Sequence, residues 1–147
     1  MTPSDTQTPT NRAEAVERFI SRAPFAQTLG MRCDIRGDQM TAILPFREAL
    51  IGNAAIRALH GGAMGAFLEL TAMAQVFLES DLDHPPRPID ITIDYLRQGQ
   101  AGDLYARARL NKIGRRMASV TAEAWQAEHQ KPVAALHGHF LVSGEDA

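Results

Sequence analysis

The longest apolar run of the chain, residues 61–78, contains one carboxylate, Glu69, near its middle. The run is long enough for a helix of about five turns, and it is apolar on nearly every side. Such a helix must be enclosed, and an unpaired ionised carboxylate moved out of water costs several kcal/mol. We therefore interpret Glu69 as a group that acts chemically on a bound molecule. The alternative is a structural Glu69, paired with an arginine from a strand or lying at a notch open to solvent.

The same run approaches the length of a membrane span, but Glu69, Gln75 and the absence of a flanking basic belt favour a buried core helix.

The chain of 147 residues predicts one domain, residues 11–147, after a polar tail, residues 1–10, that we expect to be disordered. A formal net charge of -2 predicts no general attraction to nucleic acid or to an anionic membrane. A single cysteine excludes an internal disulfide and, with no visible secretory signal, predicts a cytoplasmic protein.

Hydrophobic periodicity predicts strands on both sides of the central helix. Before it we expect a helix over 12–22, capped by Asn11 and ended by Pro24, then a hairpin of 31–36 and 39–44. Residues 45–59 read as an irregular loop with at most one helical turn. After a proline-rich loop, 81–88, four strands are predicted: 89–95, 104–110, 117–127 and 132–142.

Four consecutive antiparallel strands need cover on one face, and the helix over 61–78 is the element that is long and apolar enough to provide it. The sequence therefore predicts an α+β fold in which an antiparallel sheet packs on one long helix. A helix that is apolar nearly all round needs cover on a second side as well. In a chain this small, a partner subunit can supply that cover, so we expect a homodimer at least.

The segment His60-Gly61-Gly62 predicts a tight turn at the start of the central helix. The first free N–H groups of a helix point outward with the positive end of its dipole, so they form a cradle for an oxyanion or a carbonyl. The alternative is that the glycines only permit tight packing. Gly61 and Glu69 are roughly 12 Å apart along the helix axis. They can act on one atom only if the substrate or a partner chain bridges them.

These segments resemble the hotdog-fold acyl-CoA thioesterases of the phenylacetate-degradation HGG subgroup, over residues 25–143. The resemblance rests on five segments: Ile51–Asn53, Leu59–Gly62, Glu69, Ile91–Leu96 and Gly114–Arg116. It implies a curved antiparallel sheet wrapped around one long helix, and an active site that lies across a dimer interface, commonly in a dimer of dimers. It also implies that Glu69 is the base or nucleophile and that the Gly61 N–H binds the thioester carbonyl. His60 would support the turn and bond the carbonyl, and Asn53 would position the water.

Arg115 and Arg116 follow Gly114 in a predicted hairpin turn, and the planar fork of arginine suits phosphate. The resemblance implies that this turn lies near the nucleotide of coenzyme A. The alternative is a solvated turn. Lys112 and Arg97 are expected to assist in binding phosphate, and Gly62 is expected to contact the substrate. The acyl tail is expected to enter a pocket lined by Met64, Phe67 and Leu68.

The leading hypothesis is hydrolysis of an acyl-CoA thioester to a free acid and coenzyme A. We expect no metal and no redox cofactor, because coenzyme A is part of the substrate. One alternative is a non-catalytic module that binds acyl-CoA or an acyl carrier, which the apolar Met73 one turn after the acid favours. A second is a hotdog dehydratase, although His60 beside a turn matches its catalytic histidine poorly. His137 and His139 share a strand face, and without an evident third ligand we expect an exposed face rather than a metal site.

Overall fold

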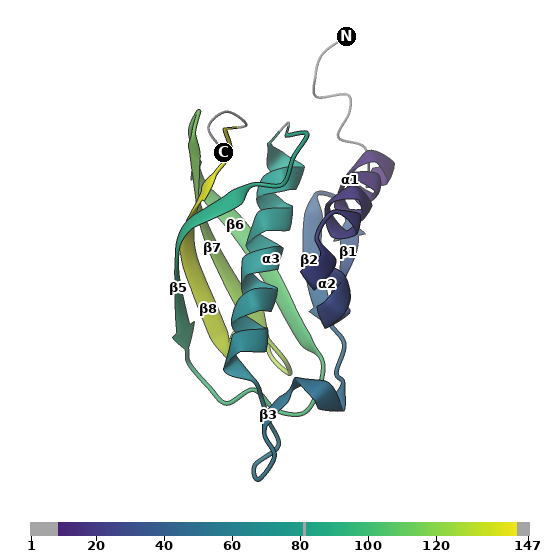
Figure 1. The fold of residues 1–147 in the computed structure, drawn as a ribbon, viewed down its shortest axis with the longest axis vertical. Coiled ribbons are helices and arrows are strands. Elements are labelled where there is room, and N and C mark those ends of the chain that lie inside the picture. The colour runs from purple at the N-terminus through teal and green to yellow at the C-terminus, as the bar shows by residue number, and fades with distance from the viewer. Residues whose placement is uncertain (1–8, 81, 144–147) are drawn as a thin grey trace.

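The structure, a computed structural model, describes residues 9–80 and 82–143. Six strands form an antiparallel sheet in the order β1-β2-β6-β7-β8-β5, and the sheet curves around one long helix, α3 (Figure 1). The strands of this sheet are β1 (Arg32–Arg36), β2 (Gln39–Leu44), β5 (Arg87–Tyr95), β6 (Leu104–Ile113), β7 (Met117–Trp125) and β8 (Ala134–Leu141). The helices are α1 (Pro9–Ser21), α2 (Pro24–Leu29) and α3 (Gly61–Glu79). This arrangement confirms the expected α+β hotdog fold.

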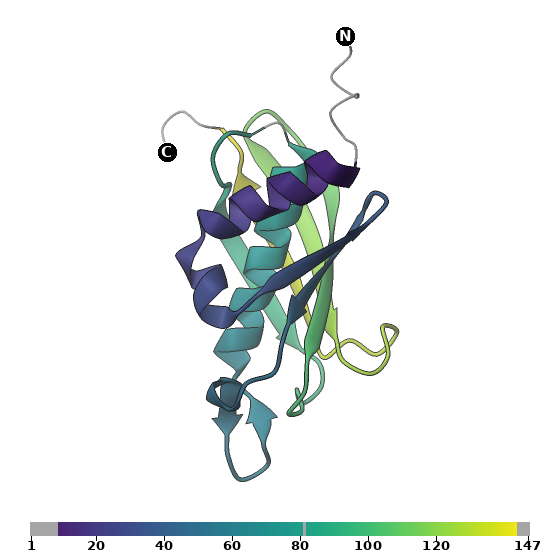
Figure 2. The same ribbon diagram turned by 90° about the vertical axis from the view of Figure 1, so that its right-hand side faces the viewer.

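Helix α3 is the centre of the core. One side packs on β6, β7 and β8, while α1 and α2 pack on another side (Figure 2). Phe67, Leu68 and Val76 of α3 are fully buried, and Phe77 meets Phe19 of α1 with ring centroids 5.9 Å apart. α3 is also the helix among the described residues that is long and apolar enough to cross a membrane. Its packing between the sheet and the two short helices agrees with the expected core helix.

The N-terminal region differs from its prediction. α1 ends at Ser21, before Pro24 as predicted, but Pro24 also begins a second helix, α2, which was not predicted. Proline suits this first helical position because the missing N–H has no partner there in any case. α1 begins at Pro9, so it takes in residues 9 and 10 of the predicted tail and places Asn11 inside the helix rather than at its cap. Residues 1–8 lie outside the described part of the chain.

The segment between β2 and α3 is more ordered than the loop predicted there. A 3₁₀ turn, η2 (Glu48–Leu50), leads into a small two-stranded hairpin of β3 (Ile51–Asn53) and β4 (Ala58–Leu59). The hairpin projects from one end of the molecule and delivers the chain directly to the start of α3 (Figures 1 and 2). This connection fixes where the predicted glycine turn lies.

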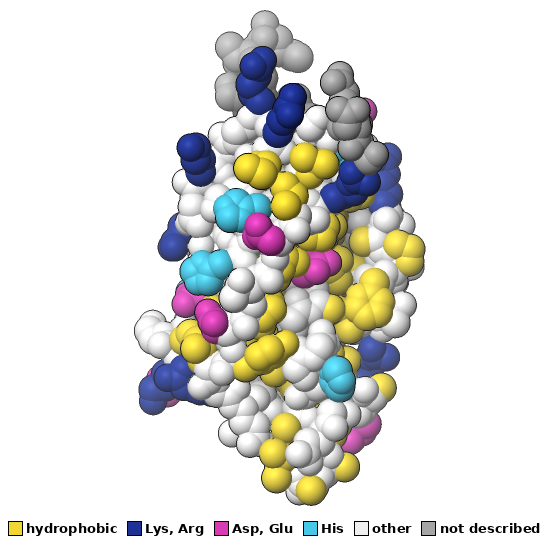
Figure 3. Space-filling view, turned by 60° about the vertical axis from the view of Figure 1, so that its left-hand side comes forward, with side chains coloured by type: hydrophobic (Ala, Val, Ile, Leu, Met, Phe, Trp, Pro, Cys, Tyr) yellow, Lys and Arg dark blue, Asp and Glu magenta, His cyan; other side chains and the backbone are white. Residues whose placement is uncertain are grey.

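Strand β5 is an edge of the sheet, and the side of the molecule around it is incompletely covered. Ile89 and Tyr95 are 50% and 54% exposed, although the Tyr95 ring lies against Gly61 and Gly65 of α3. Ile113 and Met117, at the tip of the β6–β7 hairpin, are similarly exposed. Figure 3 shows this side and the band of hydrophobic side chains that runs along it. An apolar edge of this kind is a surface on which another strand can pair.

Candidate active site

His60 forms the cap of α3. Its Nδ1 accepts a hydrogen bond from the N–H of Ala63 at 3.3 Å, and its own backbone N–H donates to the carbonyl of Leu50 at 2.8 Å. The second bond ties the start of the helix to the end of η2. Because an Nδ1 that accepts cannot carry the proton, the neutral ring carries it on Nε2. That N–H is therefore available to a ligand.

Two glycines make room for the His60 side chain. A Cβ on Gly52 would lie 2.7 Å from the Cα of His60, and one on Gly62 would lie 2.7 Å from its ring carbon Cε1. Both distances are far below ordinary contact. Gly62, the second glycine of the predicted turn, and Gly52 thus permit tight packing against the histidine that caps the helix.

Of the first four N–H groups of α3, two are hydrogen-bonded to described residues and two are not. The N–H of Ala63 bonds the His60 ring, and that of Met64 bonds the His60 carbonyl at 3.1 Å. Within the described residues, the N–H groups of Gly61 and Gly62 have no acceptor. Two unpaired donors at the positive end of a 19-residue helix are suited to bind a carbonyl oxygen or an oxyanion.

Tyr95 completes this turn, and the sequence interpretation did not include it among the site residues. Its hydroxyl donates to the carbonyl of Gly61 at 2.8 Å, from the last residue of the edge strand β5. The alternation Ile91, Ile93, Tyr95 did indicate that this side chain faces α3. It could not indicate that the end of the strand would lie opposite the start of the helix.

Glu69 lies on the least covered stripe of α3. Ala66, Glu69 and Met73 are each half-buried, whereas most of the helix is buried. Among the described residues Glu69 makes no hydrogen bond and no ion pair, so the alternative of an arginine partner finds no support. Desolvation raises the pKa of its carboxyl above the ordinary value. Gly62 lies seven residues before it and therefore on the same face of the helix.

Asn53 lies at the end of β3, in the projecting hairpin. Its side-chain oxygen accepts the N–H of Ala55 at 3.1 Å, which closes a local turn, and the residue is exposed. The bond uses the acceptor oxygen and leaves the amide NH₂ as the free donor. Its role with water stays a prediction.

Met64, Phe67 and Leu68, expected beside the acyl tail, are buried in the protein core. A cavity of about 630 Å³ lies elsewhere, between the C-terminal half of α3 and strands β2, β6 and β7. Its lining includes Gln75 and Glu79 and none of the predicted site residues. An acyl pocket along the three core residues therefore also stays a prediction.

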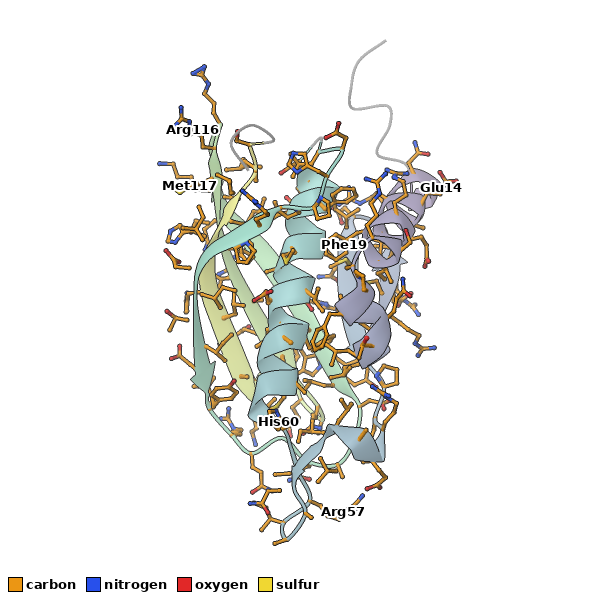
Figure 4. All side chains as sticks on the ribbon, viewed as in Figure 1. Glu14, Phe19, Arg57, His60, Arg116 and Met117 are labelled. Atoms are coloured by element: carbon orange, nitrogen blue, oxygen red, sulfur yellow. The ribbon has the colours of Figure 1, made fainter. Side chains whose placement is uncertain are left out.

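The predicted coenzyme A turn with Arg115 and Arg116 and the predicted carbonyl-binding glycine turn lie at opposite ends of the molecule. Met117 and Arg87 both pair with Leu141, which places the arginine turn beside the first residue of β5. The glycine turn lies beside Tyr95, the last residue of β5. Figure 4 shows Arg116 and Met117 at one end and His60 at the other. Within one protomer the structure does not bring these two groups together.

Other predicted residues of the substrate site are exposed. Arg97 donates to the carbonyl of Pro132 at 2.7 Å, at the same end of β5 as the glycine turn. Lys112 and Arg115 have no ion pair among the described residues, and the N–H of Gly114 closes the hairpin on the Met117 carbonyl at 2.8 Å. The arginine turn is thus exposed, and its binding of phosphate stays a prediction.

The histidines of β8 lie on an exposed face, as expected. Nδ1 of His139 is 2.9 Å from a carboxylate oxygen of Asp90, and His137 is exposed. In the described ranges no cluster of three or more His, Cys, Asp or Glu side chains could hold a metal ion.

Comparison with known proteins assigns the family. The model of the thioesterase superfamily matches residues 57–133, just over half of the chain. This protein belongs to the thioesterase superfamily. The matched span begins just before β4, runs through the glycine turn, α3 and Glu69, and ends just before β8, so it contains both the glycine turn and Glu69.

Individual relatives agree with this family. The medium/long-chain acyl-CoA thioesterase YigI of Escherichia coli K12 is 27% identical over 141 residues, which cover 86% of this chain and 90% of YigI. A solved structure of a thioesterase-superfamily protein is 29% identical, with a TM-score of 0.80 and coverage of 90% of this chain and 98% of that one. A phenylacetic acid degradation-related putative thioesterase from Ralstonia eutropha, 24% identical, has a TM-score of 0.74 and coverage of 87% and 99%. The last similarity shows the shared fold.

Proposed function

We propose that this thioesterase-superfamily protein hydrolyses an acyl-CoA thioester to a free acid and coenzyme A, as a member of the HGG subgroup. The observation that carries the proposal is that α3 presents two kinds of groups without a partner among the described residues: the Glu69 carboxyl and the N–H groups of Gly61 and Gly62. Glu69 supplies a base or nucleophile, and the two N–H groups supply donors for a carbonyl. The named activity of YigI supports acyl-CoA as the substrate class.

A second copy of the chain would complete the site. Antiparallel pairing of β5 with β5 of the partner covers the exposed Ile89 and Tyr95 and places the two α3 helices side by side in opposite directions. The glycine turns then lie at opposite ends and the two Glu69 side chains lie between them. A thioester bound between the copies can meet Gly61 of one protomer and Glu69 of the other. A dimer of such dimers would keep this interface.

The same pairing gives the arginine turn a role in binding coenzyme A. Because antiparallel strands reverse direction, the Arg87 end of one β5 lies beside the Tyr95 end of the other. Arg115 and Arg116 of one protomer thereby approach the glycine turn of its partner, with Lys112 beside them. Their guanidinium groups can bind the phosphates of the coenzyme A nucleotide, and Arg97 lies at the same end.

The proposed chemistry uses protein groups and water. The Gly61 N–H and the Nε2–H of His60 donate to the thioester carbonyl and stabilise the developing oxyanion. In one route Glu69 takes a proton from a water whose oxygen bonds the carbonyl carbon, the C–S bond breaks, and the coenzyme A thiolate leaves with that proton. In the other, the Glu69 carboxylate attacks the carbonyl carbon and expels the coenzyme A thiolate to form an anhydride. Water then cleaves this anhydride to the free acid and the Glu69 carboxylate, and the remaining proton goes to the thiolate. A raised pKa makes its carboxylate a stronger base near neutral pH. Asn53 is proposed to orient the water.

The experiment measures release of free thiol from a panel of acyl-CoAs by the parent and by Glu69→Gln. We expect the substitution to lower kcat by at least about 100-fold, because a positioned base contributes that much or more. Glu79→Gln is the matched control on the same helix, since Glu79 bonds Gln75 at the far end from the glycine turn. Equal rates for Glu69→Gln and the parent would show that Glu69 is structural.

A non-catalytic acyl-CoA or acyl-carrier binding module is the second candidate. Met73 lies one turn beyond Glu69 on the same half-buried stripe and offers water no polar support. Tight binding of acyl-CoA without thiol release from any member of the panel would establish this candidate. A dehydratase is less compatible, because Nδ1 of His60 bonds Ala63 and no acid of the described residues pairs with that ring.

A further inference from the structure

We propose that Tyr95 is the positioning residue that holds the Gly61 donor in place for the proposed thioester hydrolysis. The first observation is its hydrogen bond: the hydroxyl donates to the Gly61 carbonyl at 2.8 Å, across 34 positions of sequence. A bond between the end of an edge strand and the first residue of the central helix joins the sheet to the candidate donor. The effect of Tyr95 on catalysis rests on the proposed function, whereas its hydrogen bond to Gly61 does not depend on that function.

The second observation is the fit of the Tyr95 ring against two glycines one helical turn apart. A Cβ built on Gly61 would meet three Tyr95 atoms first, at 3.4 to 3.6 Å. A Cβ built on Gly65 would lie 3.2 Å from the Tyr95 hydroxyl, which is tighter than ordinary contact. The ring therefore lies against helix backbone that side chains would otherwise cover. This accounts for Gly65, an unfavourable residue inside a helix by about 1 kcal/mol relative to alanine.

The position of the bond explains how Tyr95 can act on the donor. In Gly61 a single Cα joins the bonded carbonyl to the unpaired N–H, and glycine has unusual freedom about both adjoining bonds. Without a restraint the N–H could swing away from the carbonyl it is proposed to bind. Tyr95 restrains Gly61 from the sheet side, while the His60 ring holds the N–H of Ala63 two residues later. A donor fixed before the substrate arrives stabilises charge without reorganisation.

The kinetic test compares Tyr95→Phe with Tyr105→Phe. These are the two tyrosines of the chain, and Tyr105 lies on the outer face of the sheet against Trp125. Loss of one neutral hydrogen bond in the transition state predicts a fall in kcat of about three- to tenfold for Tyr95→Phe. We expect KM to change less than about twofold, and Tyr105→Phe to retain the kcat of the parent. A Tyr95 that only stabilises the fold predicts a lower melting temperature with unchanged kcat, which would overturn the proposal.

A second measurement does not depend on hydrolysis. The ¹⁵N relaxation of the Gly61 and Gly62 amides reports their order on the picosecond to nanosecond timescale. We expect their order parameters to fall in Tyr95→Phe and to stay unchanged in Tyr105→Phe. Unchanged order at both amides in Tyr95→Phe would overturn the proposal whatever the kinetics. If the parent hydrolyses no thioester, the proposed function fails, and this measurement still decides whether Tyr95 holds the turn.

Discussion

The imidazole of His60 accepts the N–H of Ala63 at 3.3 Å, so the histidine of the glycine turn is also the cap of the central helix. We expect His60→Ala to lower the free energy of unfolding by about 1 kcal/mol, the usual loss when a side-chain cap is removed. His60→Asn should restore most of this stability, because asparagine is a strong cap. Urea unfolding of the three proteins measures the effect. Equal stability of His60→Ala and the parent would contradict a capping role.

The same pair of variants separates capping from carbonyl binding. If the Nε2–H of His60 bonds the thioester carbonyl, His60→Asn will keep most of the stability of the parent but will release thiol more slowly. Recovery of both stability and rate in His60→Asn would limit His60 to its structural role.

The raised pKa of Glu69 predicts a specific dependence of stability on pH. A carboxyl whose pKa is higher in the folded than in the unfolded protein binds its proton more tightly when folded. Its favourable contribution is present below the unfolded pKa and is lost as pH rises through the folded pKa. Glu69→Gln should therefore stabilise the protein relative to the parent at neutral pH, and this advantage should vanish in acid. Unfolding curves of both proteins across that range provide the measurement.

Activity should respond to the same group in the opposite direction. Because the proposed base or nucleophile is the carboxylate, kcat should fall as pH decreases through the pKa of Glu69, and that pKa should lie above the ordinary glutamate value. A pH–rate profile for kcat measures it. An acid limb at or below the ordinary value would contradict the desolvation of Glu69 in the working enzyme.

The proposed β5–β5 interface predicts that a charge at Ile89 separates the copies. Ile89→Lys should give a folded monomer with little thioesterase activity, because a buried unpaired ammonium opposes association. Phe25→Lys is the control: Phe25 is equally exposed, at 53%, but lies on α2, away from β5 (Figure 1). Sedimentation and thiol release measure both effects. An Ile89→Lys protein with the mass and activity of the parent would exclude this interface.

The arginine turn is expected to act on binding rather than on chemistry. Arg115→Ala and Arg116→Ala should each raise KM for acyl-CoA severalfold with kcat nearly unchanged, and the KM of the parent should rise with salt. Arg36→Ala, which removes an exposed arginine from the opposite edge strand, is the matched control. Steady-state kinetics provide the test. An unchanged KM in both variants would show that the turn is only solvated.

The central helix and the sheet strands were predictable because each has its own periodic pattern. α3 was predicted over 61–78 and spans Gly61–Glu79, and the alternation through Ile91 and Ile93 marked β5 correctly. α2 and the β3–β4 hairpin were missed because both are short. A helix of six residues that begins at a proline and strands of three and two residues give no periodicity to detect. Tertiary contacts stabilise them: α2 packs on α3, and the N–H of Leu59 in β4 donates to the carbonyl of Gly99.

By itself the sequence determined two features of α3: a carboxylate within an apolar helix, and a glycine turn with a histidine at the start of that helix. These follow from neighbours along the chain, since a cap and a helical face are local properties. The tertiary structure decided which groups meet that turn. It placed Tyr95 on Gly61 and left Arg115 and Arg116 at the other end of β5, because the direction and register of an edge strand depend on pairing with distant strands.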